Sequence, residues 1–377
     1  MRTLGLAVVA LLAAAGSASA DGSVTLRTVY YKETATRVEQ PMLDGIFDVG
    51  THGLLTAHLL VDAITSASAG SGAANAAAFT EHRYEGAAGY LHQLDHLRLG
   101  GDFKYSTESD YRSVYFGGRA EMDLAQKNFI LTGGGGVSLD RVSAAAAQGP
   151  SMPTINCRPN EPSSASDHCA LRVVSGFVSA SQIVSRHGVV AVTYDIARID
   201  GFQANPYRLV VTNNGFAPET HPDERLRQDV AVSARYYIPA TETTLIGAYR
   251  YYYDNWDIHA HTPELRIVQQ AGANVDASLR FRYYRQSKSF FFADRYDSTD
   301  PSMNNPAFKG NLTDDPKMSA FTGQTIEAKL GVLGDAFGAG GTWAGARFEG
   351  ILEYVIQNNR FGNAVVAQFA ITLPFAY

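Results

Sequence analysis

The sequence predicts an all-β fold, a transmembrane antiparallel up-and-down β-barrel of about sixteen strands with long extracellular loops and short periplasmic turns. Three observations support this class. Apolar and polar residues alternate with a period of two over segments of about 10–15 residues, longer than most strands of soluble proteins. The four long connections all follow odd-numbered segments of this series. After residue 20 there is no apolar run long enough for a membrane-spanning helix.

Residues 1–20 have the pattern of a cleaved secretory signal. Arg2 precedes an apolar stretch from Leu4 to Ala15, and Ala18-Ser19-Ala20 fits the small-residue cleavage rule. An N-terminal anchor helix is the alternative, but the apolar stretch is too short for a permanent span. Cleavage would leave residues 21–377 as a single barrel domain in the outer membrane of a bacterial cell.

Sixteen segments carry the alternation. In the last of them, Val365, Phe369 and Leu373 share one parity, whereas Gln368 and Thr372 share the other. A strand between lipid and lumen requires such an apolar face and a polar face. Because strands of soluble sandwiches also alternate, a soluble extracellular all-β protein is the alternative. The segments are 23–32, 36–48, 52–64, 83–93, 96–107, 110–122, 127–141, 171–184, 187–199, 226–238, 242–254, 257–269, 274–287, 319–332, 342–356 and 363–377.

Two segments contain residues that weaken a strand. Pro41 interrupts 36–48, since proline cannot donate a ladder hydrogen bond. Gly133 to Gly136 lie inside 127–141, where four glycines predict a bend or the close approach of another backbone. Two interpretations stay open: an extracellular loop folds inward and narrows the pore there, or the glycines serve only the curvature of the barrel.

The connections sort by length onto two rims. Those after odd-numbered segments include four long ones, 65–82, 142–170, 200–225 and 288–318, whereas those after even-numbered segments are short, except for the moderate 333–341. This sorting is typical of outer-membrane barrels. The sequence ends on an alternating segment with Phe375 and Tyr377. These aromatic residues resemble the signal that the outer-membrane barrel assembly machinery reads.

Four further segments carry a resemblance to a known family: Val61 to Ser68 (VDAITSAS), Asn205 to Arg208 (NPYR), Arg250 to Thr262 (RYYYDNWDIHAHT) and Arg282 to Ser287 (RYYRQS). They resemble domain-of-unknown-function family 3570, a group of uncharacterised predicted bacterial outer-membrane β-barrel proteins. The resemblance covers essentially the whole chain after the signal. It implies export and a barrel, and it implies no activity.

The polar parity of the strands predicts which residues line the lumen. A lipid-facing arginine would cost roughly 2–4 kcal/mol at the bilayer midplane, so we expect these charges to face inward. They would either screen solutes in an aqueous pore or pair across neighbouring strands and only hold the wall. Arg280 and Arg282, with Arg250 and Arg347 each two strands away, form the densest basic cluster and would favour anions at a constriction. The predicted lumen residues are Arg98, Arg119, Arg235, Arg250, Arg280, Arg282, Arg347, Asp102, Glu349 and Glu353.

The two cysteines, Cys157 and Cys169, both lie in the long connection 142–170. An exported protein meets an oxidising compartment, which favours a disulfide between them. A pair of metal-binding thiolates is the alternative, but the spacing matches no common zinc pattern.

A weak candidate metal site consists of Asp257, His259 and His261 near the long-loop rim. Solvated rim histidines are the alternative, and we expect no metal and no cofactor. The charged residues that follow have the opposite parity to the histidines. Either a bulge lies at Thr262-Pro263 or the histidines lie above the membrane.

Composition and motifs exclude several functions. The net charge of −6 offers no basic stripe for nucleic acid. A nucleophile elbow, a zinc-protease helix motif, a P-loop and a dinucleotide fingerprint are all missing from the sequence. We expect a non-enzymatic, porin-like passive channel for small polar solutes or ions through a charge-mosaic lumen. Its expected partners are outer-membrane lipid, the barrel assembly machinery and small polar solutes, while a homo-oligomer or an envelope partner stays open.

Two other functions compete with the channel. One is an occluded structural barrel that serves as a component of a cell-envelope complex, with its charges paired and its loops bound to a partner. The other is a membrane-embedded barrel hydrolase, in which an Asp–His pair distant in sequence meets in space.

Overall fold

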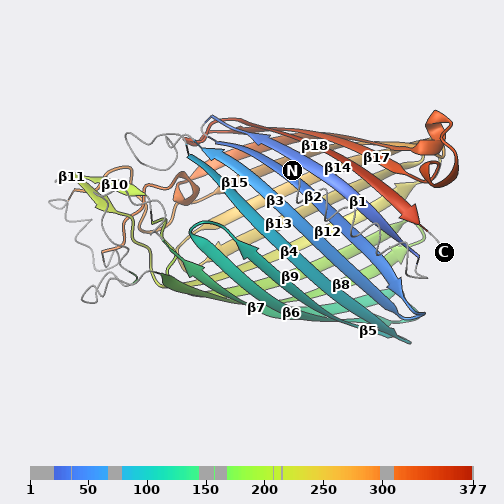
Figure 1. Cartoon of the computed structure of the whole chain (residues 1–377), viewed down its shortest axis with the longest axis horizontal. Helices are drawn as coiled ribbons and strands as arrows, with labels where there is room; N and C mark the ends of the chain where they lie inside the picture. Colours follow the sequence, from blue (N-terminus) through green and yellow to red (C-terminus); the bar gives the residue numbers. More distant parts are fainter. Residues whose placement is uncertain are drawn as a thin grey trace.

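Sixteen strands of the described chain close into one antiparallel barrel (Figure 1). Each strand pairs with its neighbour in sequence, except that β9 pairs with β12, and the first strand pairs with the last. Closure satisfies the backbone groups that an open sheet edge would expose to lipid. The predicted fold is therefore confirmed. The computed structural model describes residues 21–34, 36–66, 79–143, 157, 168–206, 208–213, 215–297 and 310–375.

The barrel strands begin and end close to the predicted positions. The largest difference is at β17, which begins at Arg347 instead of residue 342, because a short helix occupies residues 341–343. The strands are β1 (Gly22–Lys32), β2 (Thr36–Val49), β3 (Gly53–Ser66), β4 (Phe79–Leu94), β5 (Leu97–Thr107), β6 (Tyr111–Leu124), β7 (Phe129–Val142), β8 (Cys169–Ser185), β9 (Gly188–Gly201), β12 (Glu224–Ile238), β13 (Thr243–Asp254), β14 (His259–Ala271), β15 (Val275–Gln286), β16 (Phe321–Leu333), β17 (Arg347–Gln357) and β18 (Ala364–Phe375).

Five small elements lie in the connections. Strands β10 (Leu209–Thr212) and β11 (Gly215–Pro218) form a separate hairpin after β9. The 3-10 helix η1 (Pro316–Met318) precedes β16. Helices η2 (Gly334–Phe337) and η3 (Gly341–Trp343) fill the connection of moderate length between β16 and β17. None of the described helices is long and apolar enough to cross a membrane.

The ladder sorts side chains onto an apolar outer face and a polar inner face. Large apolar side chains on the outer face are exposed to solvent, and the most exposed include Leu279 at 62%, Leu352 at 57% and Phe116 at 56%. Such a surface suits lipid rather than water. Pro41 does not break β2, but the pairing with β3 skips Gln40 and Pro41, since proline has no N–H to donate.

The two rims differ as predicted. The hairpin β10–β11 and the strand ends that border the long connections lie at one end of the barrel, whereas the C-terminus and the short turns lie at the other (Figure 1). At this second rim Phe375 ends β18 and packs against Phe47, with ring centroids 5.9 Å apart. The predicted signal (residues 1–20) and Tyr377 lie outside the described residues.

Candidate functional site

The ten predicted lumen residues all share the inner face of the barrel. The register decides this, because residues directly opposite each other on paired strands point to the same side. For example, Arg98 lies opposite Glu121, and Glu327 lies opposite both Arg280 and Glu353. The inner face of the described strands is therefore charged, and the chemistry of the site depends on which charges are paired.

Arg280 on β15 is held by carboxylates from three neighbouring strands. Its Nη2 lies 2.5 Å from Oε2 of Glu327 and 2.9 Å from Oε1 of Glu353. Its Nη1 lies 3.5 Å from Oε2 of Glu264. Arg266 approaches Glu264 and Glu327 at 3.8 and 3.9 Å. Two cations thus share three carboxylates on this wall.

A second ionic group lies nearer the short-turn rim of the same wall. Nη2 of Arg347 lies 2.6 Å from Oδ1 of Asp276, and its Nε lies 3.0 Å from Oε1 of Glu349. Nζ of Lys329 lies 2.5 Å from the same Glu349 oxygen. These contacts join β15, β16 and β17 side by side.

The basic cluster expected around Arg280 is therefore largely neutralised. Arg250 donates two hydrogen bonds to Asp229, from Nε to Oδ1 at 2.8 Å and from Nη2 to Oδ2 at 2.6 Å. Of the four arginines, Arg282 alone has no carboxylate within 4.0 Å among the described residues. Parity identified the face on which these residues lie, but it could not show the acids that the register brings beside them.

Charges elsewhere on the inner face are also paired. Asp44 contacts Nδ1 of His58 at 2.6 Å and Nη2 of Arg27 at 3.9 Å. Arg98 forms ion pairs with Glu121 and Asp123. These contacts favour the predicted alternative in which charged side chains pair across neighbouring strands and stabilise the barrel. Some inner-face arginines nevertheless have no carboxylate partner among the described residues, such as Arg119 and Arg282.

The lumen holds a cavity of about 720 Å³ lined by residues of β5 to β13. Asp102, Arg119, Asp195 and Arg227 are among its lining residues. Arg119 has no ion pair among the described residues, and Arg227 donates from Nε to the Tyr252 hydroxyl at 3.2 Å. A polar cavity of this size suits water and small hydrated solutes.

The glycines of β7 form a flat surface beneath two aromatic rings. A Cβ atom on Gly136 would lie 2.3 Å from the Tyr115 hydroxyl, and one on Gly134 would lie 2.8 Å from the Phe177 ring. Both rings come from neighbouring strands, so no described loop packs on these glycines. The inward loop and the barrel curvature both stay predictions, since most of the long connections lie outside the described residues. The glycines let aromatic side chains lie flat against the wall, which keeps the lumen wider.

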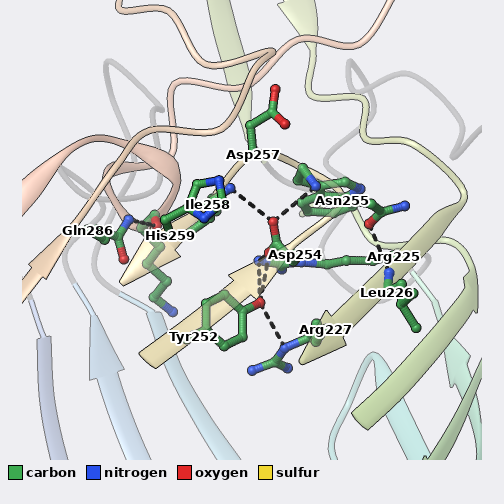
Figure 2. A network of polar contacts seen from close by, with 12 residues as sticks. Arg225, Leu226, Arg227, Tyr252, Asp254, Asn255, Asp257, Ile258, His259 and Gln286 are labelled. Carbon is green, nitrogen blue, oxygen red and sulfur yellow. Dashed lines mark hydrogen bonds and ion pairs between the residues drawn. The ribbon is translucent and has the colours of Figure 1, made fainter. Parts of the chain in front are cut away.

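Asp254 organises the long-loop rim at the end of β13 (Figure 2). Its Oδ1 accepts hydrogen bonds from the backbone N–H groups of Trp256 and Ile258, both at 3.0 Å. Its Oδ2 accepts from Arg225 at 2.6 Å and from the Tyr252 hydroxyl at 2.7 Å. The Arg225 guanidinium lies over the Trp256 ring, 4.2 Å from its centroid. Strands β12, β13 and the turn after β13 are thereby joined.

Above this network, a buried polar group links the connections 202–223 and 287–320. Glu219 accepts a hydrogen bond from Thr313 at 2.5 Å and lies 3.4 Å from Nε2 of His221 and 3.8 Å from Nε of Arg208. Arg208 also contacts Asp315 at 2.9 Å. Burial would raise the pKa of Glu219, but these neighbours outweigh it and hold that pKa below its usual value.

Aromatic side chains complete this group, which we call the loop cap. The His221 ring packs against Trp256 and Phe291, with centroids 5.2 and 5.3 Å away. Prediction from the sequence missed the loop cap. Two of the segments that carry the family resemblance, 205–208 and 250–262, supply Arg208 and Trp256 to it, and this was the signal that could have found it.

The predicted disulfide is confirmed. Cys157 and Cys169 are bonded, with Cα atoms 5.3 Å apart. Cys169 is fully buried, and Cys157 and Phe202 pack against it. The bridge therefore ties part of the connection after β7 to the start of β8.

The weak metal site at Asp257, His259 and His261 does not form. Nδ1 of His259 lies 2.9 Å from the Tyr251 hydroxyl, and Nδ1 of His261 lies 2.6 Å from the Tyr249 hydroxyl. The three residues do not bring ligand atoms together as a group. The register between β14 and β15 is the same before and after Thr262-Pro263, so there is no bulge. The expected bulge is therefore wrong, and the histidines lie on the outer face at the long-loop rim. Their position above the membrane stays a prediction.

One other group of carboxylates could hold a metal ion. In the described chain, Glu81, Glu108 and Asp110 have oxygen atoms within 4.8 Å of one another, at the long-loop rim of β4 to β6. Burial and the charges of Glu81 and Asp110 raise the pKa of Glu108 to about 7, against an opposing effect of Arg83. Protonation near neutral pH relieves the repulsion in this cluster.

Comparisons with known proteins give a family and distant structural similarities. The family profile described as "Protein of unknown function (DUF3570)" matches residues 76–357. No functionally curated protein matches the sequence.

Among solved structures, the chain is similar to OprD from Pseudomonas aeruginosa, with 7% identity, a TM-score of 0.46, and coverage of 94% of this chain and 95% of that one. A bacterial polysaccharide outer-membrane secretin gives 8% identity, a TM-score of 0.48, and coverage of 93% and 98%. Pseudomonas aeruginosa OpdK with vanillate gives 9% identity, a TM-score of 0.45, and coverage of 95% of this chain and 99% of that one. At these values, none of the similarities assigns a solute to this chain.

Proposed function

The chain belongs to the DUF3570 family of proteins of unknown function, and from the geometry of its interior we propose that it is a porin-like passive channel for small polar solutes or ions. The observation that supports this most is a closed barrel of sixteen strands with a charged inner face. Barrels of this strand number leave an aqueous channel. The polar cavity of about 720 Å³ lies in this interior.

The proposed location is the bacterial outer membrane, with the long loops outside the cell. The apolar outer face fits contact with outer-membrane lipid, and the barrel assembly machinery would insert the chain. The proposed function needs no cofactor and no catalytic residue.

Paired charges give the channel weak ion selectivity in this proposal. Ion pairs on the inner face cancel most of the field that a solute would meet. Four arginines of the inner face have no carboxylate within 4.0 Å in the described chain and would favour anions locally: Arg119, Arg227, Arg235 and Arg282. Removing Arg280 would also favour cations, because Glu327 and Glu353 would then lose their cation.

Single-channel conductance in a planar lipid bilayer tests the proposal. We expect discrete steps that grow with salt concentration and a reversal potential near zero under a salt gradient. Arg119→Ser with Arg282→Ser should shift the reversal potential toward cation selectivity, as should Arg280→Ser. Arg285→Ser is the matched control, because Arg285 lies on the outer face of the same strand as Arg282 and should leave selectivity unchanged.

The loop cap supports one competing function. Its buried core over the rim of β12 to β14 suits an occluded barrel that presents ordered loops to an envelope partner. Folded protein that gives no conductance steps would contradict the channel and favour this second function. Conductance restored by opening the loop cap with Asp254→Asn would then show that the cap closes the pore.

A further inference from the structure

Four arginines lie on the outside of the barrel on consecutive strands. Each lies near the long-loop end of its strand: Arg112 on β6, Arg141 on β7, Arg172 on β8 and Arg198 on β9. All four are exposed and alternate with the inward residues of their strands. We call this set, Arg112, Arg141, Arg172 and Arg198, the outer arginine stripe.

The stripe is continuous across the four strands. Arg112 lies directly opposite Arg141. Arg141 lies opposite Ala170, so Arg172 is one diagonal position away, and Arg172 in turn lies opposite Asp200, two residues from Arg198. Direct cross-strand neighbours have Cβ atoms roughly 5 Å apart and diagonal ones roughly 7–8 Å, which long arginine side chains can bridge.

The stripe borders the apolar band of the outer face. The next outward residues toward the other rim include Leu139, Val174 and Ile196, all well exposed. Lipid chains would cover these residues, so the guanidinium groups lie at the height of the lipid headgroups. The apolar residues match the acyl chains of an anionic lipid, and the arginine stripe beside them matches its negatively charged headgroup.

The charge of the stripe is not balanced by the described protein. Arg198 contacts Asp200 and Glu224, both at 2.9 Å, and Arg172 contacts Asp200 at 3.4 Å. Arg112 and Arg141 have no carboxylate within 4.0 Å among the described residues. Two like charges directly opposite each other on a sheet repel. Such a pair is stabilised by an anion that both guanidinium groups can bind.

We propose that the outer arginine stripe binds the phosphate groups of a phosphorylated lipid in the outer leaflet, with Arg112 and Arg141 as its main contacts. Guanidinium groups bind phosphate through paired, charge-assisted hydrogen bonds. The proposal rests on the proposed function in one respect, the placement of the barrel in an outer membrane with its long loops outside.

Lipid binding to the purified, delipidated, full-length barrel in detergent tests this, with native mass spectrometry as the readout. The probes are bis-phosphorylated lipid A, dephosphorylated lipid A with the same acyl chains, and inorganic phosphate. The test variant is Arg112→Gln with Arg141→Gln. The matched control, Lys127→Gln with Arg186→Gln, loses the same charge from exposed turns of the opposite rim. A heat-dependent shift in gel mobility verifies that each variant is folded.

We expect the test variant to bind bis-phosphorylated lipid A about 30-fold more weakly, which corresponds to about 1 kcal/mol for each arginine near an anionic surface. The control variant should bind as the parent does. Equal binding by both variants, equal binding of the dephosphorylated lipid, or equally effective competition by millimolar inorganic phosphate would overturn the proposal. The test variant should keep the conductance of the parent, so loss of lipid binding is separable from failure of the channel function.

Discussion

Replacing Asp254 by asparagine should weaken the loop cap strongly. The side chain of Asp254 is fully buried, and that of its partner Arg225 is only 14% exposed. Asparagine keeps an oxygen for the two backbone donors but presents an amide instead of a carboxylate oxygen to the guanidinium. Removing one partner of a buried ion pair costs about 3–5 kcal/mol, because the other charge remains buried and unpaired. We expect a loss of this size in the free energy of unfolding of the rim.

Tryptophan fluorescence provides the assay. Trp256 and Trp343 are the only two tryptophans; Trp256 is 1% exposed and lies under Arg225, whereas Trp343 is 52% exposed at the other rim. In a Trp343→Phe background, emission reports on the loop cap alone. Urea titration of barrels in lipid vesicles should show a lower midpoint and a red-shifted starting emission for Asp254→Asn.

A double-mutant cycle with Arg225→Met separates the ion pair from other effects. If the unpaired guanidinium is the cause, the double variant should be no less stable than Asp254→Asn alone. A loss below about 1 kcal/mol for Asp254→Asn, or strictly additive losses in the cycle, would refute the reasoning from the buried pair.

Three further predictions concern other parts of the molecule. Mass spectrometry of protein isolated without reductant should find no free thiol at Cys157 or Cys169; two alkylated cysteines would contradict the bridge. Gly136→Val should push the Tyr115 ring into the lumen and lower single-channel conductance, and Tyr115→Ala in the same chain should restore it; unchanged conductance would show that the ring does not border the pore. Because the pKa of Glu108 is raised from 4.5 to about 7, the folded state binds the extra proton and stability should fall as pH rises through this range; Glu108→Gln should flatten that slope in thermal melts, and an identical slope would assign it elsewhere.

The strands and rims could be predicted from the sequence because each depends on local information. The alternation of polar and apolar residues can be read within a single strand, and it correctly assigned residues such as Arg280 and Glu353 to the inner face. The pairing of those two residues depends on register across β16, which lies between their strands. Parity along one strand shows which face a charged residue lies on, but it does not show which residues of other strands lie beside it. The neutralisation of the basic cluster around Arg280 could therefore not be predicted.

The loop cap could not be predicted for a related reason. Thr313 and Glu219 are 94 residues apart and meet only because the barrel brings the connections 202–223 and 287–320 to one rim. The residues involved are polar and aromatic without periodicity, so no strand or helix pattern marks them. The hint in the sequence was the family resemblance of the segments 205–208 and 250–262, which contain Arg208 and Trp256.

The pairing of β1 with β18 has a consequence for how the molecule is made. Thr25 and Thr372 share a hydrogen bond across 347 positions of the chain, so the last ladder joins the first and last strands. Until β18 is synthesised, β1 carries a row of unsatisfied backbone groups, and no shorter product can bury them in lipid. Folding into the bilayer is therefore all-or-none at the level of the whole polypeptide. Most of the ladder joins strands that are neighbours in sequence, but closure of the barrel depends on one contact of very high sequence separation, which is entropically costly to form.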